Sequence, residues 1–150
     1  MDKRGEPYRG VGEVLLALGG RLTRLQTEIL AAQNQPLTIR QYRILSRVDS
    51  GHTSLTALCK LAHRNPSTMS ESVEKMVSQG LLTRGVADNS RRTMVLGLTD
   101  SGRAALEAAD RALAKFTTEL TAGVPLDLQE RMLPTLNQLY LDIQPNLDER

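Results

Sequence analysis

Short hydroxyl side chains gather at the start of one predicted helix, directly after Asn65 and Pro66. This pair predicts a helix start, because the Asn side chain caps the first turn and the missing N–H of proline costs nothing there. On its solvent side the helix is expected to carry Ser67, Thr68, Ser70, Glu71 and Lys75. Short hydroxyls let a helix enter a DNA major groove closely, and a helix N-terminus favours a phosphate. A solvated surface helix carries the same residue types, so this helix by itself supports both interpretations.

Arginines on a predicted hairpin add positive charge for the same chemistry. Arg84, Arg91 and Arg92 lie on or beside its turn, where they can contact phosphates or enter a minor groove. Asp88 is expected to pair with one of them and fix the loop, or to form only a surface ion pair worth under ~1 kcal/mol. Residues 38–99 hold nine Lys and Arg against four Asp and Glu, whereas the rest of the chain holds ten against thirteen. A basic middle between acidic ends indicates a polyanionic partner.

Other reactive side chains give weaker signals. Cys59 and His63 are four residues apart, a spacing that two metal ligands can share, but free cysteine is usually buried and we predict no metal site. A thiol-based redox sensor at Cys59 stays open as an alternative, because Lys60 and Arg64 supply an electropositive setting. The sequence shows no nucleophile with its base, no paired carboxylates and no phosphate-cradling loop. We therefore expect neither an enzyme nor a required cofactor.

The spacing of apolar residues predicts the elements that position these side chains. Steps of three and four predict helices over about 11–35, 38–49, 54–62 and 66–79, with Thr38 and either Thr53 or Ser54 as caps. Two strands are expected over 81–86 and 93–99. A fifth helix, capped by Asp100 or Ser101, and a sixth after Pro125 complete a mostly α-helical chain with a small β-hairpin wing.

The helices at both ends of the chain carry more apolar surface than one small lobe can bury. Leu106, Leu113 and Leu120 form a coiled-coil-like seam on the fifth helix. The paired glycines at 19–20 lie inside the first helix, where they permit close packing or a bend, and Pro134 is expected to kink the last one. These helices predict an obligate dimer.

Three motifs in this order resemble the MarR family of regulators. The run from Leu37 to Leu45 is similar to the LTxxQ-aromatic-xxL start of that family's second helix. Residues 55–82 resemble its helix-turn-helix and end in the same GLL. Asp88 with Arg91-Arg92, followed by LxLTxxG at 96–102, resembles its wing and the exit into the next helix. The resemblance covers roughly residues 11–145.

What the resemblance implies is a homodimer whose two recognition helices bind adjacent major grooves of a pseudo-palindromic operator. It also implies a small aromatic or phenolic effector between the dimerisation helices and the DNA-binding lobe, in a pocket formed by the first, second and fifth helices. Tyr42 and Arg43 lie near that region, and core packing is the expected role of Tyr42.

The sequence departs from the family pattern at three places. Arg64 stands in the helix-turn-helix turn where the family buries an apolar residue, which predicts different packing or a phosphate contact. Glu71 stands where the family often has arginine, and a glutamate repels phosphates but accepts a hydrogen bond from cytosine N4. The wing tip is one residue shorter than the common form, which leaves the partner of Asp88 open.

We therefore expect one MarR-type domain over 1–150, with dimerisation helices at about 11–35 and 101–145 and a winged helix-turn-helix lobe at about 38–99. The expected function is a sequence-specific regulator that binds duplex DNA and represses transcription in response to an effector. A winged-helix protein-interaction module without DNA binding is the rival, supported by the charges of Glu71 and Glu74. No apolar run approaches the ~20 residues of a membrane span, and the chain shows no signal-peptide core, so we expect a cytoplasmic protein.

Overall fold

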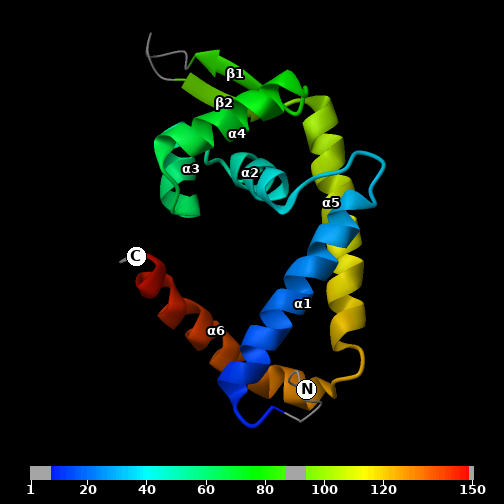
Figure 1. The fold of residues 1–150 in the computed structure, drawn as a ribbon. Helices are drawn as coiled ribbons and strands as arrows, with labels where there is room; N and C mark the ends of the chain where they lie inside the picture. Colours follow the sequence, from blue (N-terminus) through cyan, green and yellow to red (C-terminus); the bar gives the residue numbers. More distant parts are fainter. Residues whose placement is uncertain (1–7, 87–93, 149–150) are drawn as a thin grey trace.

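The computed structural model describes residues 8–86 and 94–148, and these residues form a helical stalk that carries a smaller mixed lobe (Figure 1). In chain order the elements are α1 (Val11–Ala31), α2 (Ile39–Asp49), α3 (Leu55–Ala62), α4 (Pro66–Ser78), β1 (Leu82–Val86), β2 (Met94–Leu98), α5 (Asp100–Thr121) and α6 (Leu126–Asp148). We call α2, α3, α4 and the β1–β2 hairpin the lobe, and α1, α5 and α6 the stalk. None of the described helices is long and apolar enough to cross a membrane.

The helices of the lobe begin at the predicted capping residues. The Thr38 hydroxyl accepts a hydrogen bond from the Gln41 N–H, and the Gln41 side chain bonds back to the Thr38 N–H, which completes a capping box. Ser54 caps α3. The side-chain Oδ1 of Asn65 accepts from the Thr68 N–H at 2.8 Å, and Pro66 is the first residue of α4. The predicted starts of these three helices are confirmed.

The stops of α2 and α4 depend on glycines in the left-handed region. Gly51 and Gly80 have φ values of 93° and 70°, which side chains other than glycine rarely adopt. After Gly80 the chain passes directly into β1, which pairs antiparallel with β2 so that Leu82 faces Leu98. The N–H of Leu96 bonds the Thr53 carbonyl at 2.8 Å and ties the hairpin to the start of α3.

The predicted cap of α5 is wrong by one residue. Thr99, not Asp100 or Ser101, is the N-cap, and its hydroxyl accepts from the Gly102 N–H at 2.8 Å. The same hydroxyl donates to the Gly80 carbonyl at 2.6 Å. A tertiary contact with the end of α4 therefore selects among three neighbouring residues that can all cap a helix.

One apolar core joins the lobe to the first half of α5 and the end of α1. Its fully buried large side chains are Leu30, Ile44, Leu45, Leu58, Val73, Met76 and Leu82. On α4 the side chains of Met69, Val73 and Met76 are buried, and Val77 packs against the same cluster. This core holds the polar face of α4 toward solvent.

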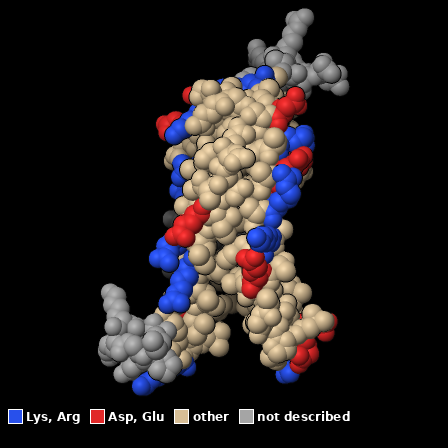
Figure 2. All heavy atoms as spheres, turned by 90° about the vertical axis from the view of Figure 1, so that its right-hand side faces the viewer, with Lys and Arg blue, Asp and Glu red and all other residues tan. Residues whose placement is uncertain are grey.

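The stalk leaves most of its apolar surface exposed in the single chain. Helix α1 continues through the paired glycines at 19–20, and α6 continues through Pro134. None of the described side chains of α6 is buried. Figure 2 views the molecule from the side of α5, where a broad band without charges runs along its length between charged edges.

Candidate nucleic-acid interface

Helix α4 presents the predicted hydroxyl face at its N-terminal end. Ser67 is exposed, whereas Thr68 and Ser70 are half-buried on the flanks of the helix. Glu71 and Lys75 are exposed. The Asn65 cap uses the N–H of Thr68, so the first-turn backbone is partly satisfied by the protein while the side chains of this face remain reachable. The structure thus places the predicted residues along one side of α4, from Ser67 in its first turn to Lys75 in its last.

Glu74 connects this face to the hairpin. Its Oε1 accepts a hydrogen bond from the Ser70 hydroxyl at 3.2 Å and lies 3.7 Å from Nη2 of Arg84 on β1. The charge of Glu74, which favoured the rival interaction module in the sequence, is therefore partly neutralised by a predicted DNA-binding arginine. The i, i+4 spacing of Ser70 and Glu74 could have indicated the first contact, but nothing local indicates the second.

The turn between α3 and α4 contains Arg64, one of the predicted DNA contacts. His63 adopts a left-handed conformation with φ of 48°, and the following Arg64 is exposed. Arg64 lines an open hollow together with Cys59, Lys60 and His63. Cys59 is half-buried and packs against the core, as free cysteines commonly do. In the described part of the chain no three His, Cys, Asp or Glu side chains gather as a metal site would require.

The predicted wing tip falls outside the described residues. Asp88, Arg91 and Arg92 belong to the segment that joins β1 to β2, between the two described ranges. Their roles remain predictions. Arg84, inside β1, is the predicted hairpin arginine that the structure does place, beside α4.

In the region expected to hold an effector, a polar contact joins α2 to α5. The Tyr42 hydroxyl donates to Oδ1 of Asp110 at 2.8 Å, and its ring packs against the core. Burial and the Asp110 carboxylate raise the pKa of Tyr42 to about 12. Arg43 is exposed, and burial together with the charge of Arg43 lowers the pKa of Arg47. The core packing expected of Tyr42 is therefore present together with a hydrogen bond.

Comparison with known proteins shows that the chain has a winged helix fold. Residues 37–102 match the family model of a winged helix DNA-binding domain. FabT of Streptococcus pneumoniae, solved in complex with DNA, superposes with a TM-score of 0.83 at 16% identity, over 93% of this chain and 99% of that one. A mutant of Escherichia coli MarR, solved with operator DNA, gives 0.71 at 20% identity, over 86% and 92%.

A third solved protein, a probable transcriptional regulator from Pseudomonas aeruginosa, gives a TM-score of 0.69 at 24% identity, over 87% of this chain and 97% of that one. No curated protein matches the sequence. The predicted fold class, a mostly helical winged helix-turn-helix with helices on both sides of it, is confirmed.

Proposed function

We propose that this chain, which contains a winged helix domain and has the fold of the MarR-family regulators, is a homodimeric, cytoplasmic, sequence-specific DNA-binding repressor. In this proposal it performs no catalysis and needs no cofactor. A small-molecule effector changes its affinity for DNA, and binding to a promoter blocks transcription.

The observation that carries the proposal is the α4 face. The helix is capped by Asn65 and begins with Pro66. It presents Ser67 and Thr68 at its N-terminal end. Arg84 of the hairpin lies next to the same helix. A helix of this kind fits a major groove, because its first residues reach base edges while flanking cations contact phosphates.

The exposed stalk supports the homodimer. Leu16 on α1 and Leu126 on α6 are 82% and 70% exposed, and further exposed apolar residues follow along both helices. A hollow of about 360 Å³ beside α6 is lined by Leu126, Met132, Leu133 and Leu136 among others. Monomeric proteins rarely expose continuous apolar surface of this kind, so a second copy is the expected cover. Two α4 helices related by a two-fold axis then address two half-sites of a pseudo-palindrome.

The proposed effector binds between the lobe and the stalk. The ring of Tyr42 and the positive charges of Arg43 and Arg47 lie on α2, which packs against α5. An apolar junction that carries an aromatic side chain and nearby polar groups suits a small aromatic or phenolic ligand. Binding there would act at the junction that sets the position of the lobe.

Salt dependence of duplex binding tests the function. Fluorescence anisotropy with a labelled duplex, between about 50 and 200 mM salt, should show affinity falling linearly with the logarithm of salt concentration, by a slope of about 0.9 per neutralised phosphate. A protein-interaction module would instead show no appreciable duplex affinity even at the lowest salt. That result would reject DNA binding and favour the rival function.

A further inference from the structure

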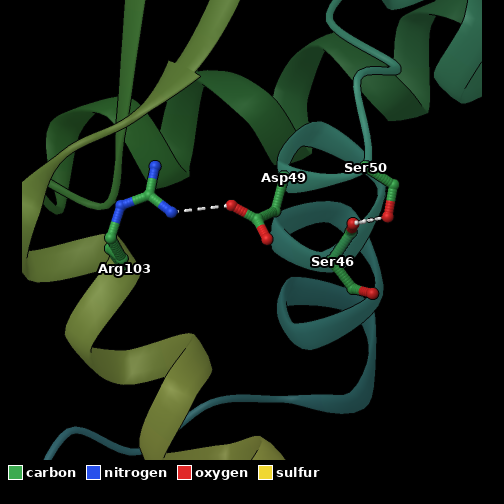
Figure 3. A network of polar contacts seen from close by, with 4 residues as sticks. All are labelled: Ser46, Asp49, Ser50 and Arg103. Carbon is green, nitrogen blue, oxygen red and sulfur yellow. Dashed lines mark hydrogen bonds and ion pairs between the residues drawn. The ribbon is translucent and has the colours of Figure 1, made fainter.

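Two polar contacts join α2 of the lobe to the first half of α5. We call them the α2–α5 clamp, formed by Asp49 with Arg103 and by Tyr42 with Asp110. Nη1 of Arg103 lies 2.8 Å from Oδ1 of Asp49, as Figure 3 shows. The Ser50 hydroxyl bonds the Ser46 carbonyl in the same turn of α2 and fixes the end that carries Asp49 (Figure 3).

The two contacts of the clamp lie at opposite ends of the length over which α2 runs beside α5. Their residues are seven apart on each helix, about 10.5 Å along the axis, and they pair in antiparallel order. A tilt of α2 against α5 about the midpoint lengthens one contact and compresses the other. Each contact lies ~5 Å from the midpoint, so a tilt of about 8° stretches a 2.8 Å hydrogen bond to the limit of ~3.5 Å. The clamp therefore resists larger rotations.

Small residues make up most of the buried face of α5. The buried face of α5 consists of Gly102, Ala105, Leu106 and Ala109, three of which have small or no side chains. Small side chains interlock little with a neighbouring helix, because knobs need holes of matching depth. The polar contacts at the two ends add angular restraint to the apolar core that α2 and α5 share.

The clamp lies where the lobe meets the stalk. Helix α5 continues beyond Asp110 along α1, away from the lobe (Figure 1). At the ~10 to 20 Å that separate α5 from a helix one or two layers away, 8° displaces α4 by roughly 1.4 to 2.8 Å. A change of one base pair alters the half-site separation by about 3.4 Å and turns the half-sites by about 34°, so each lobe of a dimer must move by about 1.7 Å along the DNA and turn by about 17°. The two displacements are of the same size.

We propose that the α2–α5 clamp is a set of positioning residues that fixes the half-site spacing accepted by the dimer. This inference rests on the proposed function and adds the element that measures the operator. The clamp touches no DNA. It acts by holding each lobe, and with it α4, at one angle to the stalk.

The test compares spacing preference between the parent and a clamp variant. A duplex is first selected from genomic fragments by the purified dimer. Dissociation constants are then measured for that duplex, for versions with one base pair inserted or removed at its centre, and for a single half-site. The clamp variant combines Tyr42→Phe, which removes only the hydroxyl, with Asp49→Asn. The control is Arg111→Gln, which breaks an exposed ion pair with Glu107 that stays within α5.

The parent and the control should discriminate against both altered spacings, and the clamp variant should lose about tenfold of that discrimination, as one or two net hydrogen bonds predict. Its affinity for the half-site should match that of the parent. Asp49→Arg alone should also relax the preference, and adding Arg103→Asp should restore it, which a simple loss of folding would not do.

Two results would overturn the clamp while leaving DNA binding intact. In one, the clamp variant keeps the parent's ratio between correct and altered spacings. In the other, it loses affinity equally on every duplex, including the half-site. A parent that selects no duplex at all would instead reject the proposed function, and the clamp with it.

Discussion

Gly102 is the position where one added methyl group should be most damaging. An alanine Cβ there would overlap the carbonyl oxygen of Leu81 and lie 2.9 Å from its carbonyl carbon. The start of α5 or the segment at Leu81 must then move by roughly 1.5 Å to reach the ~3.5 Å normal for non-bonded heavy atoms. This junction also holds the hydrogen bonds from Thr99 to Gly80 and from Gly102 to Thr99, so a shift strains them too.

The cost of Gly102→Ala follows from this overlap. Overpacking of a close contact costs about 1–3 kcal/mol, and the better helix propensity of alanine offsets at most ~1 kcal/mol in the first turn of α5. Because the overlap is with backbone atoms, the cost should lie near the upper end of this range, about 2–3 kcal/mol net. For a chain of this size each kcal/mol lowers the melting temperature by about 2–4 °C, so we expect a loss of roughly 4–12 °C. Thermal unfolding followed by circular dichroism at fixed protein concentration measures it.

Gly85→Ala is the matched control for this substitution. Its Cβ would lie 3.9 Å from the Val95 carbonyl oxygen, an ordinary contact. The melting temperature of this variant should equal or slightly exceed that of the parent, because alanine restricts the unfolded chain. If Gly102→Ala melts within about 1 °C of the parent and of this control, the close approach of α5 to Leu81 is not a constraint on the fold.

Three further substitutions test other parts of the account. Asn65→Ala removes the cap of α4 and should cost about 1 kcal/mol in urea unfolding, whereas Asn65→Asp should cost little; equal losses would show that capping is not the role of this residue. Tyr42 has a pKa of about 12 in the folded chain against 10.0 for the free group, so its contribution to stability is complete below pH 10 and is lost between pH 10 and 12. Unfolding at about pH 9 to 12 should show a smaller decline in Tyr42→Phe than in the parent, and identical declines would contradict the assignment. Glu74→Gln removes a negative charge beside Arg84 and should strengthen binding to operator and scrambled duplex alike, measured by anisotropy; weaker binding to both would mean that Glu74 holds Arg84 in place for DNA.

Local signals in the sequence were sufficient for the helix starts and stops of the lobe. Thr38, Ser54 and Asn65 cap their helices because each cap bonds an N–H only three residues away. The ends of both observed strands also lie within one residue of the predicted ends. Such contacts lie within one turn of a helix or one hairpin, so periodicity and residue type predict them.

Contacts between distant segments were beyond local patterns. Thr99 is selected as the cap of α5 by Gly80, nineteen residues earlier. The pairs of Glu74 with Arg84 and of Asp49 with Arg103 depend on how elements pack, and no spacing rule joins them. Of the predicted interface, the hydroxyls of α4 share a helix and could be grouped from the sequence, whereas the link from that helix to the hairpin needed the fold.

Hydroxyl-radical footprinting of the purified dimer on a duplex selected from genomic fragments shows whether two copies of the chain bind DNA symmetrically. If two α4 helices occupy adjacent major grooves, protection should be symmetric about a dyad on both strands, with two centres about 10 base pairs apart. Ser67 and Thr68 would then lie over the most strongly protected half-site positions. Protection without dyad symmetry, or over a single groove, would contradict a dimer that reads a pseudo-palindrome.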